Sequence, residues 1–344
     1  MGIATIKRSV MACAVLGILA SGALPAAAQS TLDRVKKRGE LVCGSNGAAP
    51  GFSMASAAGE WTGLDVDLCR AIAAATLGDA KKVKFVALST ERRFPVLESG
   101  EIDVLARNTT VSLQRAAGAK IRFAAVNYFD GQGFVVPKTL QIARASGLID
   151  KTICVTKNTT HEFNMVAWFG LRDYRVYSLA FDTEAAMYAA FFAGRCQAVT
   201  QDATALAAAV VNSGKAADYL MLQDIISKEP LGPYVREGDS GWLDVVRWTH
   251  NAMIEAEERE ITANNVSGKL EAQDLNVRLL LGTRPGNGAK LGLDEKWVFN
   301  VIKQVGNYGE SFERNLGMGS PLKFGRGLNA LWTKGGAMYP LPMR

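Results

Sequence analysis

The sequence is poor in several patterns that common protein classes require. Only two histidines occur, His161 and His250, so histidine-dependent catalysis and histidine metal sites have few candidates. No C-x-x-C pair is present, which argues against a zinc ribbon or a dithiol redox motif. The chain has no lysine and arginine run typical of nucleic-acid binding, and no apolar segment long enough to cross a bilayer follows residue 28. We therefore expect no nucleic-acid partner, no metal and no cofactor.

The first residues predict a secretory signal peptide. Lys7 and Arg8 precede an apolar stretch from Val10 to Leu24, and three alanines end at Ala28. This order of basic, apolar and small residues predicts cleavage after Ala28 and a soluble periplasmic protein. The alternative is an uncleaved anchor, but the apolar stretch is shorter than the roughly 20 residues that span a bilayer. Removing Lys7 and Arg8 from the 39 basic residues leaves 37 against 33 acidic residues, a mild positive balance.

The cysteines that remain after residue 28 point to disulfide bonds. There are four of them, an even number in a chain expected to reach an oxidising compartment. Three pairings of these four are possible. Their positions favour Cys43–Cys69 and Cys154–Cys196, one bridge in each half of the chain. Four buried free thiols are the alternative.

A repeated strand–helix pattern predicts an α/β fold with two lobes. The strand-like segments LVCGS, KVKFVAL and EIDVLAR alternate with helical segments, and KTICVT, RVYSLA and RCQAVTQD do so again later. Such alternation builds a parallel sheet covered by helices. The predicted organisation is a signal peptide at 1–28, the first part of lobe 1 at 29–132, lobe 2 at 133–232, and a return to lobe 1 with a C-terminal extension at 233–344.

Two segments of the two predicted lobes match in position and type. GEIDVLARN and GRCQAVTQD each start at a glycine that ends a helix, cross a buried strand, and reach a polar residue. These polar residues are Asn108 and Asp202. Ligands of open α/β sheets bind beyond the carboxyl ends of the strands. If the lobes face each other, Asn108 and Asp202 line one cleft between them.

The polar run NTTVSLQR is a candidate carboxylate site. Arg115 offers a planar fork of donors that fits a carboxylate, and Asn108 and Thr110 add neutral polar groups beside it. Asp202, from the facing lobe, could hold an ammonium group. A site for a carboxylate and a site for an ammonium together describe an α-amino acid. The alternative is a solvated helix cap in which Ser112 and Arg115 are surface residues.

The turn KNTTHE, residues 157–162, is a second polar candidate. It follows the strand-like ICVT and opens a helix, whose first N–H groups can bind an anion. Thr160 could donate to the ligand. The alternative is plain N-capping of the helix by Thr159 or Thr160.

Many segments together resemble one known family. They are GLDVDLCRAIAAA, VLESGEIDVLARNTT, FDGQGFVV, KNTTHE, AGRCQAVTQD, IISKEPLGPYVREGD, KQVGNYGE and GSPLKFGRGLNALWTKGGAMY. They cover nearly all of the chain after residue 28, and they resemble the solute-binding proteins of polar and general L-amino-acid ABC importers. The last four are characteristic of the general branch. The resemblance implies a two-lobed type II periplasmic-binding fold, an L-amino acid ligand held between the lobes, permease subunits as partners, and a monomer.

The resemblance also implies roles for single residues. Arg115 would take the α-carboxylate, and Asp202 would take the α-amino group. Asn108, Thr110 and Thr160 would assist at the carboxylate. Phe52, in the first loop, would flank the ligand. Two departures affect the side-chain pocket: Val111 stands where general-branch relatives often have an aromatic residue, and the loop SNGAAPGFSM is rich in alanine and glycine.

Other functions remain as alternatives. GDSG, residues 238–241, copies the nucleophile motif of some serine proteases, but only two histidines could complete a triad. A periplasmic dehydratase-like enzyme could share the fold, with His161 as its acid. A chemosensory receptor subunit for amino acids would use the same binding chemistry as an importer subunit. Ser240 is expected to cap a helix that begins near Trp242.

Overall fold

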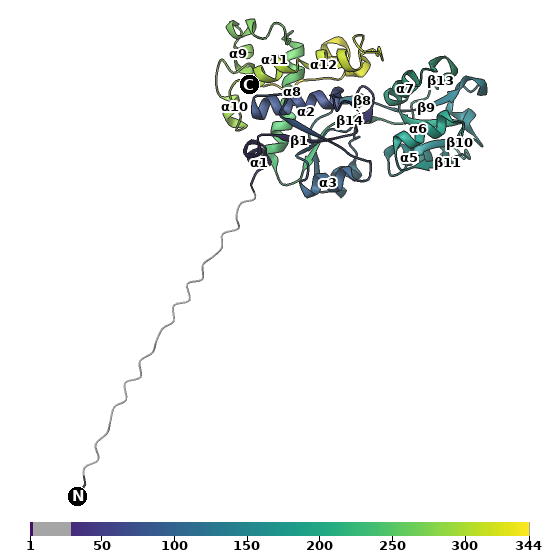
Figure 1. Ribbon diagram of the computed structural model, residues 1–344, viewed down its shortest axis with the longest axis horizontal. Helices are drawn as coiled ribbons and strands as arrows, with labels where there is room; N and C mark the ends of the chain where they lie inside the picture. Colours follow the sequence, from purple (N-terminus) through teal and green to yellow (C-terminus); the bar gives the residue numbers. More distant parts are fainter. Residues whose placement is uncertain (3–28, 344) are drawn as a thin grey trace.

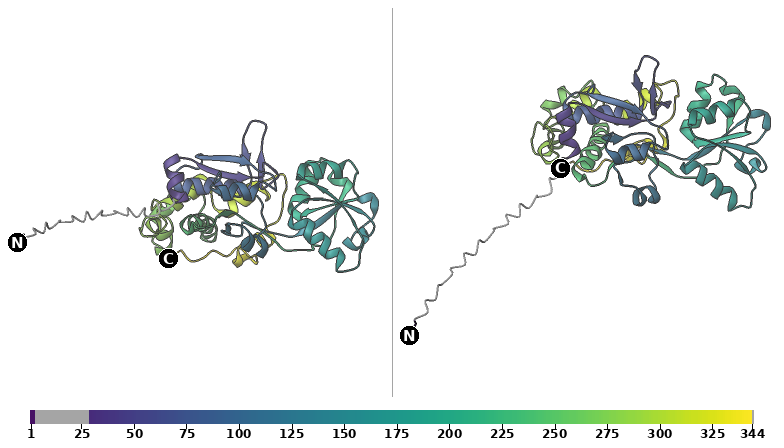
Figure 2. Two further views of the ribbon diagram at one scale, coloured as in Figure 1. Left: turned by 90° about the horizontal axis from the view of Figure 1, so that it is seen from below. Right: turned by 60° about the horizontal axis from the view of Figure 1, so that its bottom comes forward.

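The computed structural model describes residues 1–2 and 29–343, and most of the predicted signal peptide lies outside them. The described chain forms two lobes that lie side by side along the longest axis (Figure 1). Each lobe contains its own five-stranded sheet with helices packed around it, and the lobes remain distinct in two further views (Figure 2). The predicted two-lobed α/β fold is therefore confirmed. No helix in the described part of the chain is both long and apolar enough to cross a membrane.

The sheet of the first lobe has the strand order β5-β1-β6-β15-β7. Its strands are β1 (Leu41–Ser45), β5 (Val83–Ala87), β6 (Val104–Leu105), β7 (Ile121–Phe123) and β15 (Tyr234–Arg236). Strand β1 pairs in parallel with β5 and β6, as the alternating pattern predicts, whereas β15 returns from the second lobe and pairs antiparallel. A small sheet beside it contains β2 (Ala48–Ala49), β3 (Ser53–Ala55) and β4 (Trp61–Thr62).

The sheet of the second lobe has the matching order β11-β10-β12-β9-β13. Its strands are β9 (Gln132–Pro137), β10 (Thr152–Thr156), β11 (Tyr177–Phe181), β12 (Ala198–Asp202) and β13 (Tyr219–Met221). In both sheets the fourth strand is the one that has just crossed from the other lobe, and it pairs antiparallel with the third. The helices of this lobe are α5 (Thr160–Gly170), α6 (Glu184–Phe192) and α7 (Ala203–Asn212).

Two short strands carry the chain between the lobes. They are β8 (Tyr128–Asp130) and β14 (Glu229–Leu231), which pair antiparallel with Pro230 opposite Phe129. The two crossings are therefore hydrogen-bonded to each other. Asn329, far along the chain, accepts a hydrogen bond from the Phe129 N–H at 2.7 Å and donates one to the Phe129 carbonyl at 3.1 Å. The C-terminal segment is thus attached to one of the crossings.

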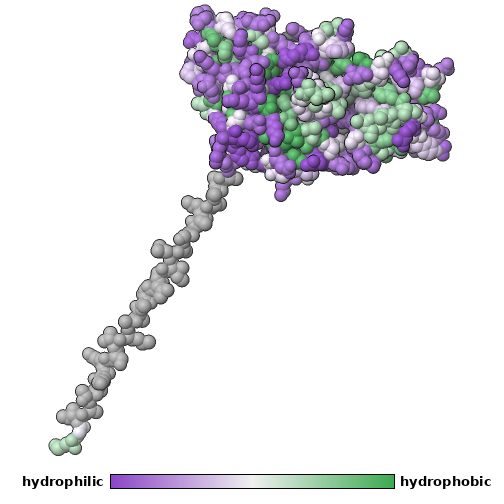
Figure 3. All heavy atoms as spheres, in the orientation of Figure 1, coloured by the Kyte–Doolittle hydropathy of each residue, from purple (hydrophilic) through white to green (hydrophobic). Residues whose placement is uncertain are grey.

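The remaining helices belong to the first lobe. They are α1 (Thr31–Arg38), α2 (Leu64–Leu77), α3 (Arg93–Ser99), α4 (Leu113–Gly118), α8 (Ser240–Glu258), α9 (Leu275–Leu280), α10 (Asn287–Lys290), α11 (Trp297–Gln304) and α12 (Tyr308–Asn315). Short 3-10 turns occur in the second lobe at Lys138–Leu140, Ala145–Leu148 and Ala216–Asp218, and in the C-terminal part of the chain at Gly268–Glu271, Gly327–Asn329 and Trp332–Lys334. Helix α2 packs against β1 on one side and against α8 and α11 on the other. The C-terminal helices therefore pack back on the first lobe, as predicted. Hydrophilic residues cover much of this lobe in the view of Figure 3.

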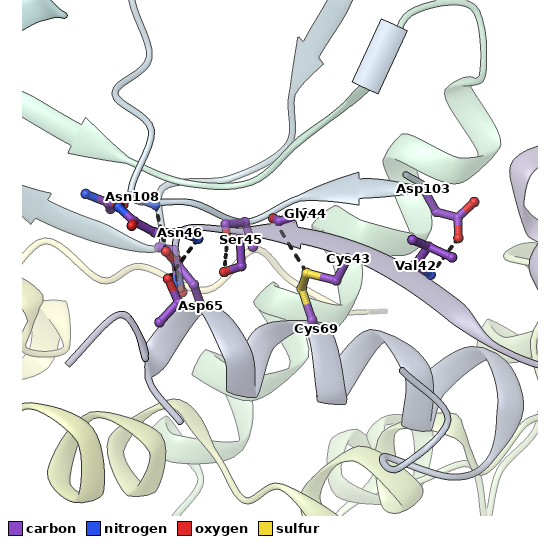
Figure 4. The surroundings of a disulfide bond; sticks show 12 residues. Val42, Cys43, Gly44, Ser45, Asn46, Asp65, Cys69, Asp103 and Asn108 are labelled. Carbon is purple, nitrogen blue, oxygen red and sulfur yellow. Dashed lines mark hydrogen bonds between the residues drawn. A yellow bond between two sulfur atoms is a disulfide. The ribbon is translucent and has the colours of Figure 1, made fainter. Parts of the chain in front are cut away.

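A disulfide bond ties a strand to a helix or loop in each lobe. Cys43 on β1 is bonded to Cys69 on α2 (Figure 4), and Cys154 on β10 is bonded to Cys196, two residues before β12. This is the pairing expected from the sequence. Because each bridge stays within one lobe, neither restricts a movement of the lobes relative to each other.

Candidate functional site

Four of the residues singled out from the sequence line one small pocket between the lobes. They are Asn108, Thr110 and Arg115 from the first lobe and Thr160 from the second. The rest of the pocket wall consists of Thr90, Arg93, Arg107, Thr159, His161, Glu184 and Gln201. Every one of these side chains is polar or charged. The pocket therefore suits a small, highly polar ligand.

Arg115 combines a fixed position with free donors. Its Nη1 donates to the Thr110 carbonyl at 2.6 Å, and its guanidinium lies 5.7 Å from the centre of the Phe94 ring. Ser112 caps α4 by accepting from the Arg115 N–H at 3.3 Å, so the predicted helix cap and the candidate site coexist. Burial lowers the pKa of the Arg115 guanidinium. Among the described residues Arg115 makes no ion pair, which leaves its other donors for a ligand anion.

Asn108 lies in a turn that α2 holds in place. Its φ of 33° is unusual for a residue other than glycine, and its backbone N–H donates to Asp65 Oδ2 at 2.7 Å. Asp65 also accepts from Asn127 Nδ2 at 3.1 Å. Burial raises the pKa of Asp65 to about 6, while these hydrogen bonds and Arg107 oppose the rise. Figure 4 shows Asp65 at the start of α2, with Asn46 and Asn108 next to it.

Glu229 connects Thr110 and Thr160 from behind the pocket wall. Its Oε2 accepts from the Thr110 hydroxyl at 2.5 Å and from the Thr160 hydroxyl at 3.0 Å. Its Oε1 accepts from Asn164 Nδ2 at 2.8 Å and from the Ser227 hydroxyl at 2.5 Å. Only 1% of the Glu229 surface is exposed. One buried carboxylate on a crossing strand thus joins side chains of both lobes.

Asp202 lies behind His161 rather than on the pocket wall. Its Oδ1 is 2.9 Å from His161 Nε2, and both side chains are buried. Burial alone would lower the pKa of His161, but the charge of Asp202 and the hydrogen bond to it outweigh burial, and the net shift is upward. Asp130 lies near enough that burial, together with the charge of Asp202, raises its pKa to about 7. The acidic centre at the end of β12 is therefore shared with a histidine that sequence reasoning did not pair with it.

The turn at the start of α5 contains both a helix cap and pocket residues. The Thr159 hydroxyl accepts from the Glu162 N–H at 3.2 Å and so caps the helix, one of the two alternatives left open by the sequence. The N–H groups of Thr160 and His161 lie in the first helical turn, where no earlier helical carbonyl can accept from them. Such groups attract the carboxylate of a ligand.

Three charged pocket residues were missed from the sequence. Arg107 donates from Nε to the Leu88 carbonyl at 2.9 Å, and its Nη2 is 3.7 Å from Glu184 Oε1 of the second lobe. Arg93 is 5% exposed, and among the described residues its buried Nε has no hydrogen-bond partner. A signal was available, because these residues follow the ends of β6, β11 and β5, the edge at which ligands of α/β sheets bind.

The predicted role of Phe52 as a ligand neighbour is not supported. The Phe52 side chain is 1% exposed and belongs to the core of the first lobe, where its ring lies 5.2 Å from that of Tyr128. It does not line the pocket. An aromatic side chain in a loop can turn into the core as readily as toward a ligand, and burial of its apolar surface favours the core here.

A cluster near the pocket has the composition of a metal site. One nitrogen of His161 and one oxygen each of Asp202 and Glu229 lie within 4.8 Å of one another. However, both oxygens of Glu229 already accept two hydrogen bonds each, and Asp202 faces His161. These contacts leave Glu229 poorly placed to ligate a cation.

Two lobes joined by a pair of crossings, with a charged pocket between them, define a binding protein for a small polar solute. The chain belongs to the bacterial extracellular solute-binding proteins, family 3, which it matches over residues 41–265. Its fold is that of the type II periplasmic binding proteins, as the matching solved structures show.

Several relatives match almost the whole chain. The general L-amino acid-binding periplasmic protein AapJ of Rhizobium johnstonii is 43% identical over 341 residues, 98% of this chain and 100% of the relative. The glutamate/glutamine/aspartate/asparagine-binding protein BztA of Rhodobacter capsulatus is 45% identical over 341 residues, 98% of this chain and 99% of the relative. A solved structure of an ABC transporter/periplasmic binding protein from Brucella ovis with glutathione bound is 45% identical, covers 92% of this chain and 100% of that chain, and has a TM-score of 0.90. Such matches include the C-terminal extension beyond residue 265.

Proposed function

We propose that this protein binds L-amino acids in the periplasm and delivers them to the permease subunits of an ABC importer. The observation that carries the proposal is Arg115, which faces a small polar pocket between two lobes and has no carboxylate partner among the described residues. The relatives named for L-amino-acid binding support the same conclusion. A protein that closes on its solute and then releases it needs such a pocket between two movable lobes.

The ligand's α-carboxylate is proposed to bind Arg115 and the first-turn N–H groups of α5. A guanidinium fork and helix N–H groups are both donors, and both complement a carboxylate. Asp202 is proposed to attract the α-amino group, with His161 between this carboxylate and the pocket. Asn108 contributes its side chain at the same wall. We keep the lobe boundaries inferred from the sequence, 29–132, 133–232 and 233–344, as part of the proposal; the crossing strands β8 and β14 end one or two residues before the proposed boundaries after residues 132 and 232.

A second carboxylate on the ligand is proposed to bind Arg93. This guanidinium is buried on the pocket wall and forms no ion pair among the described residues, although the charge of Glu184 on the same wall acts on it from farther away. A buried cation is costly unless an anion compensates it, so a ligand anion would be strongly favoured there. The relative named for binding glutamate, glutamine, aspartate and asparagine and the neighbour with bound glutathione are consistent with a range of ligands that includes acidic ones. Replacing Arg93 with Met should therefore weaken the binding of L-glutamate more than that of L-glutamine. Arg92→Ala, at the exposed neighbouring position, should change the affinity for neither ligand.

We infer that the protein is a monomeric binding subunit without catalytic activity or cofactor, secreted by a signal peptide that is cleaved after Ala28. Ser240 of the GDSG motif begins α8, which Asp239 caps, so Ser240 is not the cap expected from the sequence. Ser240 and His250 are ten residues apart on one helix, roughly 15 Å, and cannot act together. Burial lowers the pKa of His250 to about 4. His161, in the other lobe, is engaged with Asp202.

A thermal-shift screen tests the proposed function. The protein lacking residues 1–28 is mixed with each of the twenty L-amino acids, their D-enantiomers and simple carboxylates. A ligand that binds only the folded state raises the apparent stability by roughly 2.7 kcal/mol at a hundred times Kd. We expect shifts with L-amino acids, largest for acidic ones. The absence of a shift with every L-amino acid would contradict the proposal, whereas shifts that include the carboxylates would favour an enzyme or sensor of another solute class.

A further inference from the structure

Thr110 and Thr160 belong to different lobes, yet both direct their hydroxyl protons to one atom. The Thr110 hydroxyl lies 2.5 Å and the Thr160 hydroxyl 3.0 Å from the same oxygen, Oε2 of Glu229. An ionised carboxylate can only accept hydrogen bonds, and a threonine hydroxyl has one proton to donate. Both protons are therefore directed away from the pocket, toward Glu229.

The two hydroxyl oxygens remain at the pocket wall with their lone pairs. Thr110 and Thr160 line the pocket, whereas Glu229 lies behind them and is 1% exposed. With the protons engaged, each oxygen meets a ligand as an acceptor only. An acceptor repels a carboxylate oxygen and attracts an ammonium N–H. The sequence alone suggested that these two threonines assist at the ligand's carboxylate, and the geometry favours the opposite end of the ligand.

Glu229 is well held for this purpose. Its second oxygen accepts from Asn164 at 2.8 Å and from Ser227 at 2.5 Å, so all four of its hydrogen-bond partners are donors. This arrangement fixes the carboxylate plane and with it the direction of both threonine hydroxyls. One carboxylate oxygen of Asp202 and one of Glu229 lie within 4.8 Å of each other, so the two acidic groups are neighbours behind Thr160 and His161.

We propose that Glu229 is a positioning residue that turns Thr110 and Thr160 into hydrogen-bond acceptors for the ligand's α-ammonium group. The inference rests on the proposed function, because it identifies how one end of an amino acid is recognised. The two acceptors come from different lobes, and the carboxylate that orients them lies on a strand that crosses between the lobes. The ammonium group is thus recognised only where the two lobes meet.

The test compares L-glutamate with glutarate, which differ only in the α-amino group. Isothermal titration, with competition for the weaker ligand, gives the ratio of Kd for glutarate to Kd for L-glutamate for each variant. Thr160→Val or Thr110→Val removes one acceptor, so the affinity for L-glutamate should fall about tenfold to a hundredfold while that for glutarate changes within about threefold. Thr160→Ser keeps the hydroxyl and should keep the wild-type ratio. Thr249→Val is the matched control, because it removes another buried hydroxyl in the middle of α8. This variant should also keep the wild-type ratio.

Glu229→Gln tests the positioning role itself. An amide can donate, so it no longer forces both threonine protons away from the pocket, and the ratio should fall by about tenfold or more. If Thr160→Val weakens L-glutamate and glutarate by the same factor, the hydroxyl serves the carboxylate and the inference is wrong, although the proposed function stands. A wild-type ratio near one, or a ratio that Glu229→Gln leaves unchanged, also overturns the inference. A wild-type protein that binds no L-amino acid overturns the proposed function instead.

Discussion

Glu184, the first residue of α6 in the second lobe, lies 3.7 Å from Arg107 at the end of β6 in the first lobe. The same carboxylate accepts from Asn46 Nδ2 at 3.2 Å. Both contacts join the two lobes, and Arg107 and Glu184 line the ligand pocket. The Arg107 side chain is 4% exposed, so its charge has little access to water and depends on nearby anions. The Arg107–Glu184 pair therefore links the lobes beside the ligand, and its two charges influence which ligand charge is favoured there.

Removing the charge of Glu184 should change which ligands are preferred. In Glu184→Gln, Arg107 loses its nearest anion, and an acidic ligand side chain becomes more favourable beside it. We expect the ratio of Kd for L-glutamine to Kd for L-glutamate to rise by about tenfold, equivalent to ~1.4 kcal/mol. Asp182→Asn is the control, because Asp182 forms an exposed pair with Lys157 on the same side of the second lobe. Calorimetric titration of both variants with the two amino acids tests this prediction. A fall in the ratio of Kd for L-glutamine to Kd for L-glutamate would show instead that Glu184 recognises the ligand directly.

Arg115 should be required for every amino acid ligand. Its loss leaves the shared α-carboxylate without its main cation in a closed pocket, which costs about 2 to 5 kcal/mol of binding, or some thirtyfold to several-thousandfold in Kd. Arg115→Lys should also bind poorly, because an ammonium group cannot copy the two-pronged donor geometry. Arg122→Ala, which removes an arginine from an exposed pair with Glu237, should bind normally. Titration with three chemically different amino acids is the measurement. Binding of all three within twofold of wild type by Arg115→Ala would refute the assignment.

The stability of the protein should depend on pH through His161. Its pKa is raised above the ordinary 6.5 in the folded state, despite burial, by the charge of Asp202 at 2.9 Å. A group that binds its proton more tightly when folded stabilises the fold below its unfolded pKa, and this contribution disappears as the pH rises through the folded pKa. The difference in melting temperature between wild type and His161→Gln should therefore be largest below about pH 6.5 and should shrink above it. Asp130, Glu229 and Glu184 also act on this site, so the comparison must be made with the variant at each pH.

Strand ends could be predicted from the sequence because they depend on local pattern. Asn108 and Asp202 were placed at the ends of two buried strands, and the structure puts them after β6 and at the end of β12. Arg115 and Thr160 followed from the polar runs beside those strands. The parallel pairing of the first three strands in each sheet and the two disulfide pairs also agree with the expectation of one α/β unit per lobe, whereas the antiparallel fourth strand of each sheet was not predicted.

Other features depend on contacts between distant segments and could not be predicted. Helix α2 is buried nearly all round because α8 and α11, from the end of the chain, cover the side away from the sheet. No role could be predicted for Glu229 from the residues around it, because its partners Thr110 and Thr160 come from elements far away in the chain. Phe52 was assigned to the ligand because nothing local distinguishes a loop aromatic that points to a pocket from one that packs in the core.

Closure of the lobes should depend on the glycine at the first crossing. Gly131 lies between β8 and β9, and a Cβ at this position would lie 2.4 Å from Cγ2 of Ile225 and 3.0 Å from the Ser227 carbonyl oxygen. Gly131→Ala therefore clashes, in the present arrangement of the lobes, with the segment that leads into the second crossing. We expect saturating ligand to make the wild-type protein more compact in small-angle scattering. The variant should bind at least about tenfold more weakly, since part of the binding energy must overcome the clash.

Gly170→Ala is the matched control for this experiment. Gly170 ends α5 in the second lobe, and a Cβ there meets no atom within 4 Å. This variant should bind and close like wild type. If ligand leaves the radius of gyration of the wild-type protein unchanged, the lobes do not close about these crossings. If Gly131→Ala and Gly170→Ala bind equally well, the crossing at Gly131 tolerates the added methyl group and the bending must occur elsewhere, with β14 at Pro230 as the remaining strand between the lobes.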